Sequence, residues 1–288
     1  MPTPQVRFPA GATVPAIGQG TWHMGEQASR RDDEIRALQL GVDLGLTLID
    51  TAEMYGDGSA EEVVGKAIRG RRDKVFLVSK VLPSNARHNA VIDACERSLK
   101  RLATDRLDLY LLHWRSSTPL EETLSAFEQL IKQGKIRHYG VSNFDADDMQ
   151  ELAGKSFGQQ CQTNQVLYNL GSRGIDFDLL PLMAERHIPV MAYCPLAQAG
   201  ALDGTLWKNA QLRSIAEKHQ ATVGQILLAW SIRPQANTYP VLAIPKATEP
   251  QHVRENAAAL DIQLDAQDLA LLDRAFPAPT RKVLLDII

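Results

Sequence analysis

The chain alternates between short apolar, strand-like segments and helical segments along almost its whole length. This alternation predicts βα units whose strands lie parallel in one sheet. The first of eight such strands covers residues 17–20, and the others end at Asp50, Lys80, His113, Asn143, Gln165, Tyr193 and Lys246. Eight units favour a closed (β/α)8 TIM barrel over an open doubly wound sheet. No Gly-x-Gly-x-x-Gly follows any strand, so a Rossmann dinucleotide site is also unsupported.

Three segments lie outside the simple alternation. Residues 6–14 predict an N-terminal β-hairpin, residues 222–232 a second helix in the seventh crossover, and residues 265–275 an extra C-terminal helix. The other helices are expected at residues 60–68, 89–102, 120–131, 145–152, 178–186, 209–219 and 249–260. We therefore predict an α/β protein with one (β/α)8 barrel, preceded by a hairpin and followed by an extra helix.

Length and composition narrow the classes of partner. The 288 residues suit one barrel, and no linker divides them, so residues 1–288 are expected to form a single domain. A net charge of −3 argues against a nucleic-acid partner, and no apolar run reaches the roughly 18 residues of a membrane span. The N-terminus lacks the parts of a signal peptide, and Cys95, Cys161 and Cys194 form no disulfide pattern. We expect a cytoplasmic monomer.

Reactive side chains follow three consecutive strands. Asp50, Lys80 and His113 end the second, third and fourth strands, and Tyr55 lies in a glycine-containing loop just after Asp50. Because barrel active sites lie at the carboxyl ends of the strands, these four side chains should meet. Taken singly, each has an ordinary explanation as a cap, a surface residue, a solvated strand end or a core residue. Their joint position favours a catalytic site.

A phenol beside an ammonium is a good proton donor for a carbonyl. Two charges about 4 Å apart at an effective dielectric of about 20 interact by roughly 4 kcal/mol. This is enough to lower the pKa of Tyr55 from about 10 by about three units. Lys80 would supply the charge, Asp50 would hold it, and His113 would orient the carbonyl.

The order and spacing of several motifs are specific. The relevant stretches are residues 20–22 (GTW), 49–56 (IDTAEMYG), 78–80 (VSK), 107–114 (LDLYLLHW), 136–144 (IRHYGVSNF), 162–165 (QTNQ), 192–196 (AYCPL) and 244–247 (IPKA). With these motifs the sequence resembles the aldo-keto reductase family over essentially its whole length. The resemblance implies that Asp50, Tyr55, Lys80 and His113 are the family's catalytic tetrad, with Tyr55 as general acid. It also implies hydride transfer from a reduced nicotinamide to a carbonyl carbon.

The same resemblance implies where a cofactor would lie. Ser142, Asn143 and Gln165 would hydrogen-bond the nicotinamide carboxamide, and Tyr193 would stack on the ring. The full set of expected cofactor contacts is Gly20, Thr21, Trp22, Asp50, Ser142, Asn143, Gln165, Tyr193, Cys194, Pro195, Leu196, Gln198, Ile244, Lys246, Ala247, Thr248, His252, Glu255 and Asn256. Cys194 is interpreted as a buried small residue rather than a nucleophile.

The cofactor preference depends on the segment after Lys246. NADPH-preferring relatives usually carry Ser or Thr directly after this lysine and Arg six residues beyond it, where this chain has Ala247 and His252. Thr248 and Arg254 are candidates to replace the missing groups. We expect NADPH, with NADH as the alternative.

Aromatic residues are expected around the substrate. Trp22, Tyr55, His113 and Trp114 would form the substrate pocket, and Trp207 is a further candidate wall. The loop at residues 114–117 and the tail after residue 275 are short. Both features suggest an open pocket for small aldehydes, dicarbonyls or aromatic aldehydes.

Three other functions remain open from the sequence. Lys80 could form a Schiff base in an aldolase, and His113, Asp50 and Glu53 could hold a metal in a hydrolase, although we expect no metal site. A nicotinamide-sensing subunit of the kind found with potassium channels is the third. Cyanoborohydride trapping of substrate on Lys80 would support the aldolase, and a chelator should leave the activity of a reductase intact. Turnover of small aldehydes would separate an enzyme from the sensor.

Overall fold

The computed structural model describes residues 3–197, 205–235 and 240–288. The strands are β1 (Gln5–Arg7), β2 (Thr13–Pro15), β3 (Gln19–Gly20), β4 (Leu48–Asp50), β5 (Phe76–Val81), β6 (Leu107–Leu112), β7 (Ile136–Ser142), β8 (Asn164–Leu167), β9 (Val190–Tyr193) and β10 (Val241–Ala243). The α-helices are α1 (Arg31–Asp43), α2 (Ser59–Ala67), α3 (His88–Leu102), α4 (Leu120–Lys132), α5 (Ala146–Ala153), α6 (Leu179–Glu185), α7 (Thr205–Lys208), α8 (Ala210–Lys218), α9 (Val223–Ser231), α10 (Pro250–Ala258) and α11 (Ala266–Ala275).

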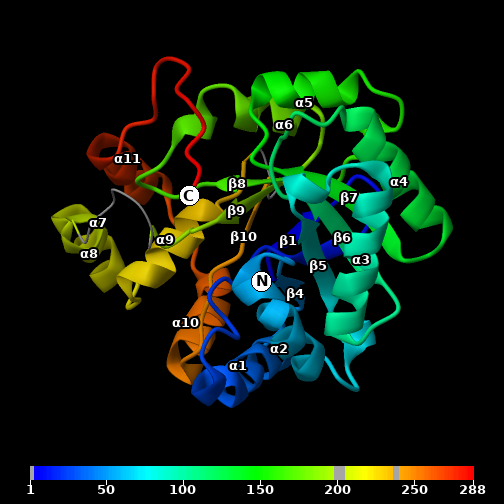
Figure 1. The fold of residues 1–288 in the computed structure, drawn as a ribbon. Coiled ribbons are helices and arrows are strands. Elements are labelled where there is room, and N and C mark those ends of the chain that lie inside the picture. The colour runs from blue at the N-terminus through cyan, green and yellow to red at the C-terminus, as the bar shows by residue number, and fades with distance from the viewer. Residues whose placement is uncertain (1–2, 198–204, 236–239) are drawn as a thin grey trace.

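Strands β3 to β10 form one parallel sheet in chain order, with helices on its outer side (Figure 1). A parallel bridge between Ile17, just before β3, and Ala243 in β10 joins the two edges of the sheet. Backbone hydrogen bonds from Gly18 to Ala243 and from Gly20 to Pro245 extend this contact. The predicted eight-stranded α/β barrel is therefore confirmed, and the carboxyl ends of its strands share one rim.

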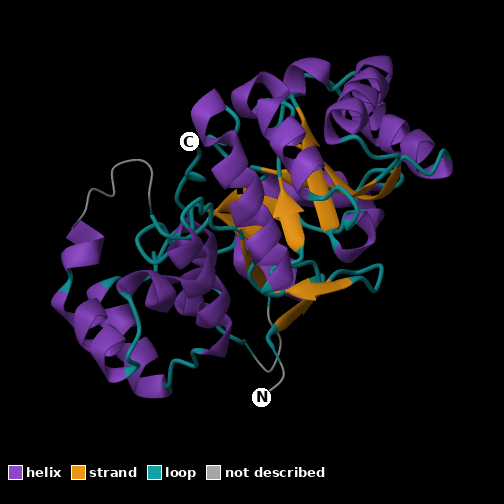
Figure 2. Ribbon diagram, turned by 90° about the horizontal axis from the view of Figure 1, so that it is seen from below, coloured by secondary structure: helices purple, strands orange, loops and turns teal. Residues whose placement is uncertain are grey.

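The predicted hairpin is formed by β1 and β2, which pair antiparallel between residues 5 and 15. It lies apart from the barrel strands, near the N-terminus (Figure 2). The Phe8 ring stacks on Phe76 at the start of β5, with centroids 5.3 Å apart, and the Ala10 amide donates to Gln162 Oε1 at 2.8 Å. Phe76 begins β5 and Gln162 lies just before β8. The hairpin therefore covers the amino-terminal end of the barrel and leaves the opposite rim free.

The predicted helices are present, including α9 and α11, although their ends differ from the predicted ones. Two helices, α1 and α7, were not predicted. Two predicted strand ends were wrong, because β8 continues past Gln165 to Leu167 and β10 ends at Ala243, before Lys246. The β10 error arises because Ile244 to Lys246 lie in an irregular segment beyond the ladder.

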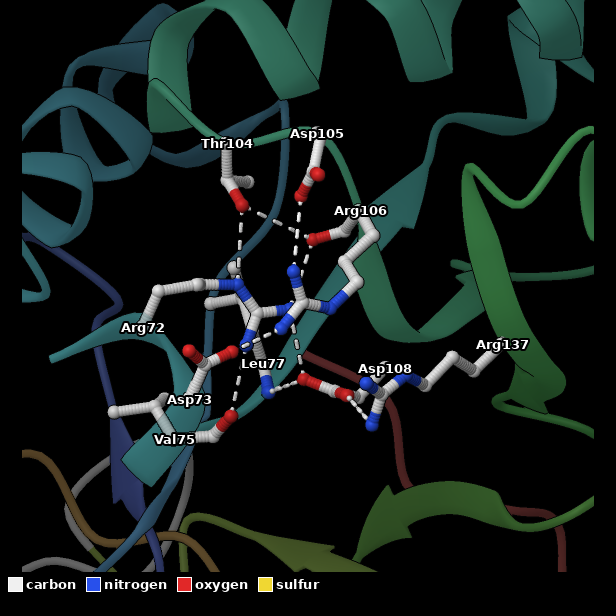
Figure 3. A network of polar contacts seen from close by, with 9 residues as sticks. All are labelled: Arg72, Asp73, Val75, Leu77, Thr104, Asp105, Arg106, Asp108 and Arg137. Atoms are coloured by element: carbon white, nitrogen blue, oxygen red, sulfur yellow. Dashed lines mark hydrogen bonds and ion pairs between the residues drawn. The ribbon is translucent and has the colours of Figure 1, made fainter.

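A polar network ties three strands together at the amino-terminal end of the barrel (Figure 3). The Asp108 carboxylate lies at the start of β6 and is almost fully buried. It accepts a hydrogen bond from the Leu77 amide at 2.9 Å and pairs with Arg72 at 2.8 Å and Arg137 at 3.1 Å. Arg72 also donates to the carbonyl of Arg106 at 2.8 Å. The network is far along the strands from the reactive rim, which implies a structural role.

We expect Asp108→Ala to lower the free energy of unfolding by about 3 kcal/mol, because it leaves the poorly exposed Arg72 guanidinium without its carboxylate. Asp105→Ala is the matched control, since Asp105 pairs with Arg106 at the surface and should change stability little. Urea unfolding measures both. Equal losses of unfolding free energy in the two variants would show that the buried Asp108 ion pair stabilises the fold no more than a surface pair.

Candidate active site

The buried Lys80 side chain connects two of the predicted residues. Its ammonium donates to Asp50 Oδ2 at 2.7 Å, to the Thr51 carbonyl at 3.0 Å and to the Tyr55 hydroxyl at 3.0 Å. Lys80 is fully buried and Asp50 is 1% exposed. Three oxygens therefore satisfy the three N–H groups of the ammonium, and the phenol is held against a buried positive charge.

A tight turn places Tyr55 over the rim. Tyr55 begins a short 3₁₀ segment, Tyr55–Gly58, in which Gly56 and Gly58 have φ values of 54° and 91°. The Ser59 hydroxyl donates to the Gly56 carbonyl at 2.7 Å, and an added Cβ on Gly56 would lie 2.4 Å from that hydroxyl oxygen. Asp57 between them is also left-handed, with a φ of 51°, and the two glycines adopt this conformation without the strain that a side chain adds.

The predicted lowering of the Tyr55 pKa is wrong for this structure. Burial is the largest influence and raises the pKa of Tyr55 above its ordinary value, and the Lys80 charge offsets only part of that rise. For the ammonium, burial is outweighed by Asp50 and Tyr55, so the pKa of Lys80 also lies above its ordinary value. The Lys80 charge alone would lower the pKa of Tyr55, but the loss of water around the phenol outweighs that charge. At neutral pH the cluster therefore holds a protonated phenol and a charged lysine.

His113 follows β6 and faces the same cavity. Its ring lies edge-on to Tyr55, with centroids 5.8 Å apart. Burial, followed by the Lys80 charge, lowers the pKa of His113 to about 2. His113 Nδ1 is buried and has no hydrogen-bond partner among the described residues. The imidazole is therefore neutral at physiological pH, and it can orient a carbonyl by a hydrogen bond but cannot serve as a strong acid.

The low pKa of His113 predicts a pH-dependent stability. An unfolded histidine titrates near about 6.5, so below that pH the unfolded chain binds a proton that the folded chain excludes. Between about pH 7 and about pH 5, the free energy of unfolding of the wild type should fall by about 2 kcal/mol more than that of His113→Gln. Urea titrations at the two pH values provide the comparison. Parallel losses in the two proteins would show that His113 is charged in the folded state.

Polar side chains from β7 and β8 line the other side of the cavity. Gln165 Nε2 donates to Asp50 Oδ1 at 2.8 Å, and the Ser142 hydroxyl donates to the Gln165 carbonyl at 2.8 Å. Asn143 Nδ2 donates to the His113 carbonyl at 3.1 Å, while its Oδ1 accepts from the Tyr193 hydroxyl at 2.9 Å. The sequence did not reveal that Gln165 contacts Asp50. This contact fixes the amide side chain directly against the Lys80 cluster.

A cavity of about 520 Å³ unites these groups at the barrel rim. This volume is in the range of small-molecule sites. The described lining residues include these expected ones: Gly20, Thr21, Trp22, Asp50, Tyr55, His113, Trp114, Ser142, Asn143, Gln165, Tyr193, Cys194, Pro195, Ile244 and Lys246. They also include His23, Met54 and Ile288, which the sequence analysis missed.

The other expected cofactor contacts lie elsewhere. The cavity lining does not include Leu196, Ala247, Thr248, His252, Glu255 or Asn256. Leu196 packs in the hydrophobic core, and the other five lie in the segment from β10 into α10. Gln198 lies outside the described residues. Cys194 is half-buried and lines the cavity, contrary to the expected full burial, and its surroundings raise the pKa of the thiol to about 11.

The expectation that Trp207 forms a wall of the pocket was wrong, and the segment after α11 contributes a wall residue that the sequence did not reveal. Trp207 is not among the described lining residues, because α7 directs its ring towards Gly224 of α9. The segment after α11 also returns to the rim, where Ile288 lines the cavity. Lys282 pairs with Asp147 at 2.7 Å and so ties this segment to α5. Such a long-range contact has no local signal in the sequence.

A (β/α)8 barrel with a polar cavity at the carboxyl ends of its strands has the arrangement typical of a barrel enzyme. The Aldo/keto reductase family model matches residues 16–276. Methylglyoxal reductase YeaE from Escherichia coli is 57% identical over 283 residues, with 98% of each chain covered. Glyoxal reductase from Bacillus subtilis is 33% identical, covering 93% of this chain and 91% of its own.

A solved structure gives the same result. An aldo-keto reductase from Klebsiella pneumoniae, crystallised in complex with NADPH, is 56% identical, covers 100% of both chains and superposes with a TM-score of 0.96. The chain belongs to the aldo/keto reductase family, and it is an oxidoreductase.

Two features are absent from the part of the chain that the structure describes. No helix there is both long and apolar enough to cross a lipid bilayer. Within the same residues, no group of three or more His, Cys, Asp and Glu side chains is arranged to hold a metal ion.

Proposed function

We propose that this protein reduces small aldehydes and dicarbonyls to alcohols with NADPH, with Tyr55 as the general acid. The observation that carries the proposal is the 3.0 Å hydrogen bond from Lys80 Nζ to the Tyr55 hydroxyl at the cavity. The names of the Escherichia coli and Bacillus subtilis relatives, methylglyoxal reductase and glyoxal reductase, support small dicarbonyls as substrates. The NADPH in the Klebsiella pneumoniae structure supports the cofactor.

The chemistry of the lining fits a nicotinamide cofactor. Ser142, Asn143 and Gln165 present a hydroxyl and two amides, which suit a flat carboxamide, and the Tyr193 ring offers a surface for stacking. Lys246 adds a positive charge to the same cavity, where phosphates would be favoured. When bound, the reduced cofactor would supply a hydride to the carbonyl carbon.

The side chains of this chain would then manage the proton and the carbonyl oxygen. The protonated Tyr55 donates a proton to that oxygen, and the Lys80 ammonium stabilises the phenolate left behind. Asp50 keeps the ammonium charged and in place through its 2.7 Å contact. The neutral His113 donates a hydrogen bond to the same oxygen and fixes its direction.

The remaining walls suit small, weakly discriminated substrates. Trp22, Met54 and Trp114 line the cavity beside Tyr55, and Met54 is 38% exposed. The Trp22 ring stacks on His23 with centroids 4.2 Å apart, which gives this wall a defined shape. An apolar rim above a single proton donor selects a carbonyl mainly by size.

Three further proposals come from the sequence. We propose that residues 1–288 form one domain, that the protein acts as a monomer in the cytoplasm, and that it has neither a nucleic-acid nor a membrane partner. They rest on the net charge of −3, the unbroken alternation and the scattered cysteines.

The site disfavours the competing functions. A Schiff-base aldolase needs a neutral lysine, yet the raised pKa of Lys80 keeps it charged. In a metal hydrolase, Glu53 would have to bind the metal together with His113. Its Oε1 instead accepts hydrogen bonds from the Leu82 amide at 2.8 Å and from Asn85 at 2.9 Å.

The proposed function is tested by the loss of NADPH absorbance with methylglyoxal, glyoxal and benzaldehyde as separate substrates. We expect consumption that depends on both the carbonyl and the protein, and faster turnover with NADPH than with NADH. The absence of carbonyl-dependent consumption with every substrate would refute the proposal. A clear advantage for NADH would refute the cofactor assignment alone.

A further inference from the structure

Arg30 lies against the segment that follows β10, although 218 residues separate it from Thr248. Its guanidinium donates to Thr248 Oγ1 at 3.1 Å and lies 3.6 Å from Glu249 Oε1. Arg30 ends a short 3₁₀ turn, Ala28–Arg30, directly before α1, and α1 packs on α10. Figure 1 shows these two helices side by side, one blue and one orange. The fold therefore carries a permanent positive charge to the start of α10.

The Glu249 carboxylate is a replaceable partner for Arg30. Glu249 immediately precedes α10, but its side chain caps no backbone amide of that helix. It is 64% exposed and Arg30 is 42% exposed, so their ion pair contributes little to stability. Another anion could take the place of this carboxylate without uncapping α10.

The neighbours of Arg30 suit a phosphate group. Lys246 lines the cavity two residues before Thr248, and the Thr248 hydroxyl, which accepts from Arg30, retains a proton to donate. An arginine can bind two phosphate oxygens at once in a fixed geometry, whereas a lysine interacts with phosphate as a single point charge. Arg254, the arginine on α10, is exposed and lies further along that helix. Arg30 and Thr248 are thus in direct contact, and Lys246 lies two residues before Thr248 on the same segment.

A dinucleotide in the cavity would extend past Lys246 towards these groups. Its nicotinamide end is expected at Gln165 and Asn143, so its adenosine end must lie beyond the other side of the cavity. NADPH differs from NADH by one phosphate on the adenosine ribose. We propose that Arg30 binds this 2′-phosphate and determines the preference for NADPH over NADH, an inference that rests on the proposed cofactor.

The test measures binding rather than turnover. Isothermal titration calorimetry gives the dissociation constants of NADP⁺ and NAD⁺ for the wild type and for Arg30→Ala. Loss of one charge-assisted contact should raise the dissociation constant of NADP⁺ by about tenfold or more. The dissociation constant of NAD⁺ should not change. Glu249→Gln removes the competing carboxylate, so it should increase the affinity for NADP⁺ but not the affinity for NAD⁺. Titration with 2′-AMP and 5′-AMP should show the same contrast.

Arg36→Ala is the matched control, because it removes one exposed arginine from α1 that pairs with Asp33 rather than with α10. We expect it to leave both dissociation constants unchanged. Arg30→Lys serves as a second variant and should give an intermediate loss of NADP⁺ affinity, and thermal unfolding verifies that each variant is folded.

The outcomes separate this inference from the proposed function. A wild type that binds neither nucleotide contradicts the proposed function itself. If the wild type binds NADP⁺ and Arg30→Ala binds it equally well, Arg30 has no such role and only this inference fails. Equal weakening of NAD⁺ would assign Arg30 a structural role, and a selective loss in Arg254→Ala alone would assign the phosphate to Arg254.

Discussion

Tyr55→Phe should lower kcat for carbonyl reduction by about a hundredfold to ten-thousandfold, the usual contribution of a positioned general acid. The substitution removes only the hydroxyl that Lys80 contacts at 3.0 Å. The ring remains, with its edge-on contact to His113 and the Lys80 ammonium 4.6 Å from its centroid. NADPH binding should therefore be retained. Steady-state kinetics measure kcat, and quenching of tryptophan fluorescence measures binding.

Tyr193→Phe is the matched control, because it removes a hydroxyl from the same cavity. That hydroxyl donates to Asn143 Oδ1 at 2.9 Å and has no contact with Lys80. It should alter mainly the affinity for NADPH. Similar losses of kcat in the two variants, or near wild-type turnover in Tyr55→Phe, would show that Tyr55 is not the acid.

The raised pKa of Tyr55 also fixes the sign of the pH dependence. The acid acts in its protonated form, so activity is lost only as the pH rises through the pKa of Tyr55, which lies above its ordinary value of about 10. The reduction rate of the wild type should therefore not decline between about pH 7 and about pH 9.

Local patterns were enough to predict the eight barrel strands and the reactive residues at or next to the ends of β4, β5 and β6. Asp50, Lys80 and His113 could be brought together because parallel strands share one rim, and a rim position needs no knowledge of side-chain packing. Helix α1 was missed because its buried face includes Glu34 and Gly41, so its apolar stripe is thin. Helix boundaries shifted by a residue or two, as caps and fraying ends usually cause.

Long-range effects could not be predicted in this way. The contact between Arg30 and Thr248 joins distant parts of the chain, as does the Lys282–Asp147 pair that holds the segment leading to Ile288. The sign of the Tyr55 pKa shift depends on how much water the fold removes from the phenol, and no motif reports that quantity. The site chemistry was thus predictable by residue type, but not in its electrostatic balance.

The second large effect is expected from Lys80→Met, which removes the ammonium that stabilises the Tyr55 phenolate. We expect kcat to fall by about a hundredfold to ten-thousandfold. The substitution also leaves Asp50 buried without its partner, which should cost about 3–5 kcal/mol of unfolding free energy. A loss of activity alone would therefore not distinguish a damaged site from a damaged fold.

The double substitution Asp50→Asn with Lys80→Met separates these two effects. It removes both members of the buried ion pair, so most of the lost stability should return, because no uncompensated charge remains in the barrel. Activity should stay low, since the Tyr55 hydroxyl still lacks its ammonium partner. Urea unfolding and steady-state kinetics on the wild type, Lys80→Met and the double variant give the comparison. If turnover recovers together with stability, Lys80 acts only by supporting the fold, and proton donation by Tyr55 does not depend on its charge.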